Sequence, residues 1–417
     1  MTQALLCFAL LLARTGFRGS PMHAVIDAVR QACRVVAWAA LAFGGSAQAQ
    51  AVDLNPALLD LAPNRWTRLH TPAVEEWSRQ AHAGMAYDSK RGTLLIFGSN
   101  THGLDWDNTV HEFDPVTARW VTHYPEAPQA SYRADDKERA IAGGQRRLPW
   151  AMHTFAGVAY DPQRDGLIVA ARPEHNPIGK KTPAAKIHPS WFYSQTRREW
   201  QMLPDSDQAA PKFFGAAAAY DERRRVAVAY RWGIWELLSQ GGTTNSPETA
   251  WVKVSRENHH QMHHNMVYDS RRGNFAVFGD YRNTNDVWIY MPGARPGEEG
   301  HWEKRSPDGD ACPRAQHFPV AFDREQGVFL LVPGNTEFEL LPNGRERARR
   351  PKSNSTFVYD PDANRYLRLP GADMPALGMN FMMAYDPRHK VFLLVSGGPS
   401  EAPTVWALKL DLTGLKR

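Results

Sequence analysis

The sequence predicts an all-β fold, a six-bladed β-propeller of four-stranded antiparallel blades, because two features repeat along it. A motif that ends in an aromatic residue and Asp recurs six times, at intervals of 48 to 73 residues. A short polar turn and an apolar run follow each copy, which is the pattern of a β-hairpin. Self-similarity at about fifty residues is typical of propellers, because one such unit cannot bury its faces alone. The copies end at Tyr87-Asp88, Tyr160-Asp161, Tyr220-Asp221, Tyr268-Asp269, Phe322-Asp323 and Tyr385-Asp386.

The second half of each unit predicts two more strands. Three units carry an aromatic residue, a polar turn and a second aromatic residue seven positions later: Phe113 and Trp120, Tyr193 and Trp200, and Tyr359 and Tyr366. Polar residues and Asp-Pro pairs in these intervals are good turn chemistry. Each unit therefore has strands a to d. Together these residues resemble the Kelch family of β-propellers, in the superfamily that includes galactose oxidase, over about residues 63–411. The paired Gly that usually closes strand b in that family stands, at the ends of the second strands, only at Gly397-Gly398, so the repeats are degenerate.

The two ends of this repeat region complement each other. Residues 64–69, with Trp66, predict a strand d that has no strands a to c before it. The last unit provides strands a to c, the third at residues 404–410 with Trp406, and no strand d after it. Pairing the two fragments completes the sixth blade and leaves no open edge between first and last blade. Residues 50–417 are therefore expected to form a single propeller domain.

Residues 1–49 are interpreted as a signal peptide, and Met22 is an alternative start of translation. Arg30 and Arg34 precede a short apolar run, and Ala47-Gln48-Ala49 supplies a small-x-small cleavage site. The apolar run is too short to cross a bilayer, so we expect no stable membrane span in the mature chain. The protein is expected to be exported, to the periplasm or beyond.

Composition excludes little. The net charge of +5 is too weak to indicate nucleic-acid binding. Only Cys312 remains after the expected cleavage, so the mature chain cannot form an internal disulfide, and we expect this thiol to be structural.

The candidate ligand site is the mouth of the central channel, where the d–a and b–c connections of a propeller open on one face. Long insertions at residues 125–149, 173–189 and 334–352 fall on such connections, and long loops on a rigid scaffold often carry binding sites. Strand a is innermost, so the residues at its start should surround the mouth. They are His82, Phe155, Gly215, His263, His317 and Asn380, with His153 two positions before Phe155. Residues that follow strand b should join them, including His102, Arg172, Arg231, Asp280, Tyr281 and Arg282.

A divalent metal ion is one candidate ligand for this region. His259, His260, His263 and His264 fall within six positions, and neutral imidazole suits several divalent metals. Neighbouring residues of a strand point to opposite faces, so the four are not expected to meet one ion. Their spacing matches no closed structural zinc motif.

We expect the mouth to bind a carbohydrate or another polar ligand. The alternative is an enzyme that cleaves uronate-containing polysaccharide by β-elimination. His82 and His102 look similar to a His pair of some propeller lyases. Arg172 or Arg282 would neutralise the uronate carboxylate, and a His or Tyr281 would abstract the α-proton. A copper-radical oxidase, which the superfamily also suggests, is less favoured, because that site needs a Cys in an early blade.

Overall fold

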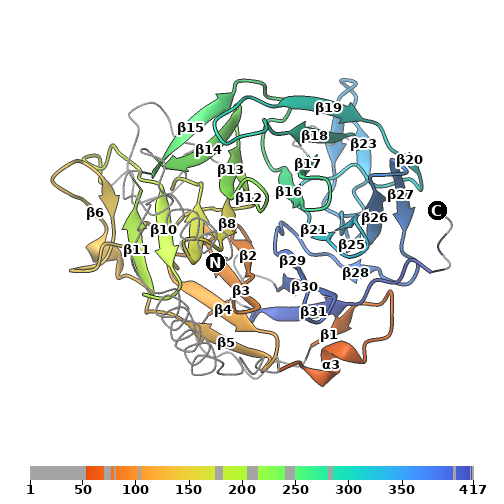
Figure 1. Cartoon of the computed structure of the whole chain (residues 1–417), viewed down its shortest axis with the longest axis horizontal. Coiled ribbons are helices and arrows are strands. Elements are labelled where there is room, and N and C mark those ends of the chain that lie inside the picture. The colour runs from red at the N-terminus through yellow and green to blue at the C-terminus, as the bar shows by residue number, and fades with distance from the viewer. Residues whose placement is uncertain are drawn as a thin grey trace, which may run out of the picture. The chain divides into compact units, whose positions relative to one another are not determined.

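The innermost strand of each blade holds one copy of the repeated motif. In the computed structural model these strands surround the centre of a ring (Figure 1), and each is a terminal strand of its sheet. The six innermost strands are β2 (Gly84–Asp88), β8 (Val158–Asp161), β12 (Ala217–Asp221), β16 (Asn265–Asp269), β21 (Val320–Asp323) and β29 (Met383–Asp386).

Each innermost strand begins an antiparallel meander that runs outward, as predicted. The second strands are β3 (Thr93–Phe97), β9 (Gly166–Val169), β13 (Val226–Tyr230), β17 (Asn274–Phe278), β22 (Val328–Leu331) and β30 (Val391–Ser396). The third are β4 (Val110–Asp114), β10 (Trp191–Ser194), β14 (Ile234–Ser239), β18 (Val287–Met291), β26 (Phe357–Asp360) and β31 (Thr404–Leu408). The fourth are β5 (Arg119–Thr122), β11 (Glu199–Met202), β15 (Thr249–Ser255), β19 (His301–Arg305), β27 (Arg365–Arg368) and β1 (Thr67–Arg68). The described part of the chain thus forms a six-bladed β-propeller.

The N-terminal strand closes the ring. β1 pairs antiparallel with β31, with Thr67 opposite Ala407 and Arg68 opposite Trp406. The pairing continues beyond β1, because the backbone N–H of Leu69 donates to the Val405 carbonyl at 2.9 Å. The sixth blade therefore combines both ends of the repeat region, which confirms the expectation from sequence.

The Asp of the repeated motif organises the turn between strands a and b. The Asp88 carboxylate accepts the backbone N–H groups of Lys90 at 2.9 Å and Arg91 at 3.0 Å. Asp161, Asp221, Asp269 and Asp323 make the same pair of bonds two and three residues ahead. A short polar side chain that caps its own turn in this way explains why Asp recurs at this point.

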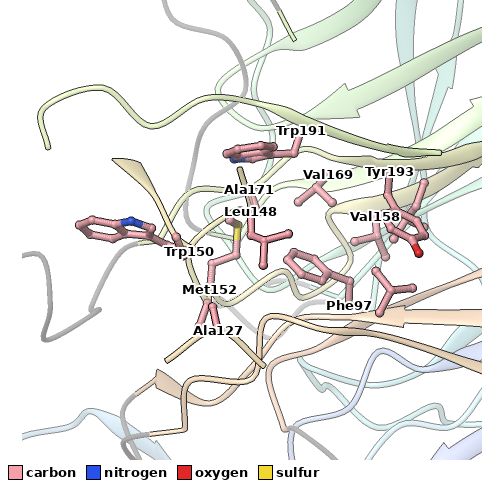
Figure 2. Close-up of a cluster of buried hydrophobic side chains, with 14 of the residues drawn as sticks. Phe97, Ala127, Leu148, Trp150, Met152, Val158, Val169, Ala171, Trp191 and Tyr193 are labelled. Carbon is pink, nitrogen blue, oxygen red and sulfur yellow. The ribbon is translucent and has the colours of Figure 1, made fainter. Parts of the chain in front are cut away.

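The first insertion is part of the core. Residues 125–149 contain β6 (Arg133–Ala134) and β7 (Ala140–Ile141) and lie on the d–a connection, as predicted. Ala127 and Leu148 pack with Trp150 and Trp191 against strands of the first two blades (Figure 2). The Trp150 indole N–H donates to the Ile141 carbonyl at 2.9 Å. Part of this loop is therefore anchored in the core, and other parts of it, including residues 144–147, are exposed.

The remaining elements are short. β23 (Phe338–Leu340) and β24 (Glu346–Ala348) form a hairpin in the b–c connection of the fifth blade. β25 (Ser353–Asn354) pairs with β28 (Met374–Pro375), and β20 (Asp308–Gly309) adds to β27 in parallel. In the described part of the chain, the helical pieces include α3 (Pro56–Leu59), which Asn55 caps, and the 3-10 turn η2 (Gln129–Ser131).

The structure describes residues 53–69, 77–78, 81–101, 105–173, 182–203, 215–239, 249–279, 285–397, 401–413 and 415. The predicted signal peptide lies outside these residues and stays a prediction. Leu54–Arg417 forms one compact unit. Among the described residues, we find no helix with the length and hydrophobicity needed to span a bilayer.

Candidate functional site

The residues that begin the innermost strands are bonded to one another across blade boundaries. The His82 carbonyl accepts the backbone N–H groups of Thr154 at 3.0 Å and Phe155 at 2.9 Å. The His317 carbonyl likewise accepts the Asn380 N–H at 3.0 Å. These bonds hold the starts of neighbouring strands at fixed separations, so side chains distant in sequence share one small region.

Four predicted imidazoles meet there in two pairs. The rings of His82 and His153 stack with centroids 4.0 Å apart and planes 14° from parallel. The rings of His263 and His317 meet edge to face, also with centroids 4.0 Å apart. The sequence placed these four residues near the mouth, and the structure brings each pair into direct contact.

Two phenylalanines link the imidazole pairs. The centroid of the Phe155 ring lies 5.4 Å from that of His82 and 5.2 Å from that of His263. It also lies 5.7 Å from the centroid of the Phe381 ring. Phe381 in turn lies 6.0 Å from His317. We call this set, His82, His153, Phe155, His263, His317 and Phe381, the His–Phe cluster.

Burial within the cluster keeps the imidazole of His317 neutral. Phe155 and His153 are 1% exposed, whereas His82 and His317 are only partly buried. Desolvation, together with the neighbouring imidazoles of His263 and His82, lowers the pKa of His317 to about 2. His317 is therefore a neutral imidazole at physiological pH, with one hydrogen-bond donor and one acceptor. Its buried Nε2 has no hydrogen-bond partner within the protein.

The backbone at these positions adopts a conformation that favours glycine. His263 has φ of 64° and His317 has φ of 57°, and Phe155 has φ of 48°. The equivalent residue of the third blade is Gly215, with φ of 72°. Side chains with a Cβ are disfavoured in this left-handed region. Large aromatic or imidazole side chains therefore occupy three positions with this backbone conformation, whereas the equivalent position of the third blade holds glycine.

Asn380 supports the backbone at the start of β29. Its side chain is fully buried, its amide nitrogen donates to the Val395 carbonyl at 2.9 Å, and its oxygen accepts the Met382 N–H at 2.7 Å. These bonds orient the segment that carries Phe381.

The third blade presents an exposed tryptophan at its b–c connection. Trp232 is 51% exposed and has φ of 50°, and its backbone N–H donates to the Asn258 side chain at 3.0 Å. The guanidinium of the buried Arg231 lies 4.9 Å from the Trp232 ring centre. This fixed turn holds a flat apolar ring toward solvent. Trp235, by contrast, is 2% exposed and belongs to the core, as expected.

The four clustered histidines fall into three environments, of which His260 and His264 share one. His259 stacks on Trp288 with ring centroids 3.8 Å apart. The His260 ring lies 3.0 Å from the Tyr230 hydroxyl, and the His264 ring contacts the Tyr230 carbonyl at 3.3 Å. His263 lies in a bend before β16, with φ of 64°, and its ring turns toward His317, so the alternation of a strand does not set its direction. Among the described residues, no group of three or more His, Cys, Asp or Glu side chains is arranged to hold a metal ion.

The other predicted residues are only partly placed. Arg172 follows β9 on a b–c connection and is partly exposed. His102, Asp280, Tyr281 and Arg282 lie outside the described residues. Cys312 is buried, and burial raises its pKa, which agrees with a structural thiol. Sequence reasoning placed Phe155 at the mouth without a role and missed Phe381, whose only signal is its position directly after Asn380.

Comparison with known proteins identifies no family. No family model matches the chain, and no curated protein matches it. Hydrazine synthase of Kuenenia stuttgartiensis is similar in structure, with a TM-score of 0.41 and 12% identity over 78% of this chain and 77% of that one. An auxiliary nutrient binding protein of Bacteroides thetaiotaomicron has a TM-score of 0.41 and 8% identity, over 78% of this chain and 68% of that one. The site must therefore be interpreted from its own residues.

Proposed function

We propose that this protein is an exported Kelch-like propeller that binds a carbohydrate or another polar ligand through the His–Phe cluster. The site lies where innermost strands begin, on the face where the d–a and b–c connections open. Export rests on the signal-like residues 22–49, and the Kelch-type assignment rests on the degenerate repeats alone.

The observation that carries the proposal is the left-handed backbone of His263 and His317. An L-residue in this conformation costs roughly 1–2 kcal/mol that glycine avoids. Gly215 shows that glycine suits the equivalent position of this ring. Strained side chains of this kind gather at functional sites, because the stability they cost is compensated elsewhere in the fold. The neutral imidazole of His317, in contact with the ring of His263, offers a donor and an acceptor suited to hydroxyl groups.

Trp232 favours a carbohydrate among polar ligands. A pyranose ring has an apolar face and polar edges, so it matches a flat aromatic ring beside hydrogen-bonding groups. The Asn258 side chain fixes the Trp232 turn before any ligand arrives. A platform that is already ordered lowers the entropy that binding must overcome.

The experiment replaces the imidazole without disturbing the backbone. We expect His317→Gly to keep the fold, because glycine is favoured at this φ, and to weaken binding at least about tenfold, as loss of a buried hydrogen bond would. A glycan screen of the mature protein identifies the ligand, and calorimetric titration then compares the variants. His301→Ala, which removes an exposed imidazole on β19, is the control. Unchanged affinity in His317→Gly and in Trp232→Ala would show that the ligand binds elsewhere.

The lyase is a second proposal, favoured by the contact of His82 with His153 and by the partial exposure of Arg172, which follows β9. It also needs His102, Tyr281 and Arg282. Elimination leaves an unsaturated sugar that absorbs in the ultraviolet, so absorbance during incubation with acidic polysaccharides tests it. We expect Arg172→Ala or Arg282→Ala to slow such a reaction by orders of magnitude through loss of charge stabilisation. If the absorbance does not rise with any acidic polysaccharide, the lyase proposal is wrong and only the binding function remains.

A further inference from the structure

The innermost strands also enclose a cavity of about 610 Å³ at the other end of the ring. Its lining extends from residues of the a–b turns, such as Ser89 and Pro387, inward to Phe381. The four imidazoles of the His–Phe cluster are not among its lining residues, although Phe381 belongs to both. The His–Phe cluster therefore lies beyond the inner end of this cavity.

The inner part of the cavity is apolar and small residues give it room. Met85, Met266 and Met383 line it together with Phe381. Alanines stand at many of the other positions: Ala86, Ala156, Ala159, Ala218, Ala219, Ala321 and Ala384. Flexible methionine side chains adapt to the shape of an apolar guest. The volume is within the range of roughly 300–1,000 Å³ that small-molecule sites occupy.

A collar of six aromatic rings surrounds the outer part. The rings are those of the repeated motif: Tyr87, Tyr160, Tyr220, Tyr268, Phe322 and Tyr385. The Tyr87 hydroxyl donates to Asp386 of the neighbouring blade at 2.8 Å, and Tyr268 and Tyr385 bond in the same way to Asp221 and Asp323. These bonds hold the rings in place. Burial raises the pKa of each of the five tyrosines, so the phenols stay uncharged.

The charged groups at the rim decide between an anionic and a cationic guest. Arg225, Arg324 and Glu222 line the entrance, which leaves one net positive charge. Glu222 is already paired with Arg324 at 2.6 Å, whereas the Arg225 guanidinium lies against the neutral Gln163 amide. Aromatic rings alone would also attract a cation, but the spare guanidinium opposes one.

We propose that this cavity binds a small organic acid, with its apolar, preferably flat body inside the aromatic collar and its carboxylate at Arg225. A guanidinium binds a carboxylate through two parallel hydrogen bonds, which would orient the guest. The site opens at the other end of the ring from the His–Phe cluster and shares with it only Phe381, and the proposal does not depend on the proposed function.

The test uses 2-naphthoate, which combines a flat apolar body with one carboxylate, and calorimetric titration of the full mature chain. We expect saturable binding of one equivalent, and at least about tenfold weaker binding of the neutral 2-naphthalenemethanol, because the charge-assisted bonds are lost. Arg225→Gln should weaken the binding of 2-naphthoate by a similar factor and leave the affinity for the neutral alcohol unchanged. Arg197→Gln, on the exposed c–d turn of the second blade, is the matched control and should change neither.

A second variant tests the location. Ala219→Phe places a ring inside the cavity and should abolish binding of both probes, and thermal melting reports whether it folds. Three results would overturn the proposal: no saturable binding of 2-naphthoate to the wild-type chain, equal binding of acid and alcohol, or affinity for the acid unchanged in Arg225→Gln. Arg225 is an exposed turn residue that contributes little to stability, so Arg225→Gln is expected to fold. If Ala219→Phe does not fold, the binding measured with Arg225→Gln decides the question by itself.

Discussion

The two ends of the ring are built on opposite rules. At the a–b end the blades repeat nearly the same residues: Asp caps its own turn, and Tyr87, Tyr268 and Tyr385 bond to the Asp of the neighbouring blade. At the other end the equivalent positions hold His, Phe, Gly and Asn. Contacts between blades repeat because each interface is alike. The starts of the innermost strands do not repeat in this way: three carry His and the others carry Phe, Gly and Asn, a variation that the proposed binding site would require.

A second contact between neighbouring blades also recurs at the a–b end. An arginine of one blade donates to backbone carbonyls of the next blade's a–b turn, over a glycine, and we call this contact the Arg–Gly latch. Arg388 donates to the carbonyls of Lys90 and Arg91, directly over Gly92. Arg223 makes the same contact with the turn of the fourth blade, over Gly273, and Arg271 reaches toward the turn of the fifth blade over Gly327. The missing Cβ of each glycine leaves room for the arginine of the preceding blade, so Arg and Gly recur together although they lie far apart in sequence.

The largest expected effect comes from opening the ring. Deleting residues 53–69 removes β1 and α3, together with the bond from the Asn55 N–H to His389 at 3.0 Å. It exposes the edge of β31 and should lower the free energy of unfolding by several kcal/mol, because a whole paired strand and its buried surface are lost. Thermal and urea denaturation measure the loss. A chain that starts at residue 53 is the control, and equal stability of the two chains would contradict closure by β1.

The irregular end should respond to acid. The pKa of His317 is about 2 in the fold and ordinarily about 6.5 when unfolded, so the unfolded state binds the extra proton between these values. This contribution to stability is complete above pH 6.5 and falls by ~1.4 kcal/mol per pH unit below it. Between pH 7 and pH 5 we expect wild type to lose about 2 kcal/mol more than His317→Gly. Parallel urea titrations at the two pH values test this, and parallel losses would refute the desolvation of His317.

The Arg–Gly latch should be worth less. Gly273→Ala introduces a Cβ at φ of 74° and forces it against Arg223. Gly371→Ala has the same strain, with φ of 75°, but open space around the new methyl group. Both variants should lose roughly 1 kcal/mol from backbone strain, and we expect Gly273→Ala to lose about 1 kcal/mol more by displacing Arg223. Equal melting temperatures for the two would show that the latch contributes nothing.

The smallest expected effect is a gain. Phe322 is the exception in the aromatic collar, and its blade follows the one that carries Asp269. Phe322→Tyr would restore the bond that Tyr268 makes to Asp221, and should stabilise the protein by up to about 1 kcal/mol. Tyr268→Phe is the reciprocal control and should lose a similar amount. Chemical denaturation reads both, and a Phe322→Tyr variant less stable than wild type would mean that Asp269 cannot accept the hydroxyl.

Sequence reasoning went furthest where the interactions are local. Asp-capped turns, alternating strands and the aromatic pairs predicted the hairpins residue by residue, and the blade count and the complementary end fragments predicted closure by β1. It also placed His82, His263 and His317 near one another, because equivalent positions of repeats must lie on one ring. The role of Phe381 escaped it, since no repeated pattern marks that residue.

The amino-acid sequence by itself determined the propeller, its number of blades and how it closes, because hairpin formation depends on turn chemistry and alternation within a few residues. Only the tertiary structure decided which side chains touch. It divided the clustered histidines among Trp288, Tyr230 and His317, and it turned part of the first insertion into core. It also left a cavity at the end opposite the mouth. Those outcomes depend on how neighbouring blades pack, and the packing of surfaces distant in sequence is not encoded in any local pattern.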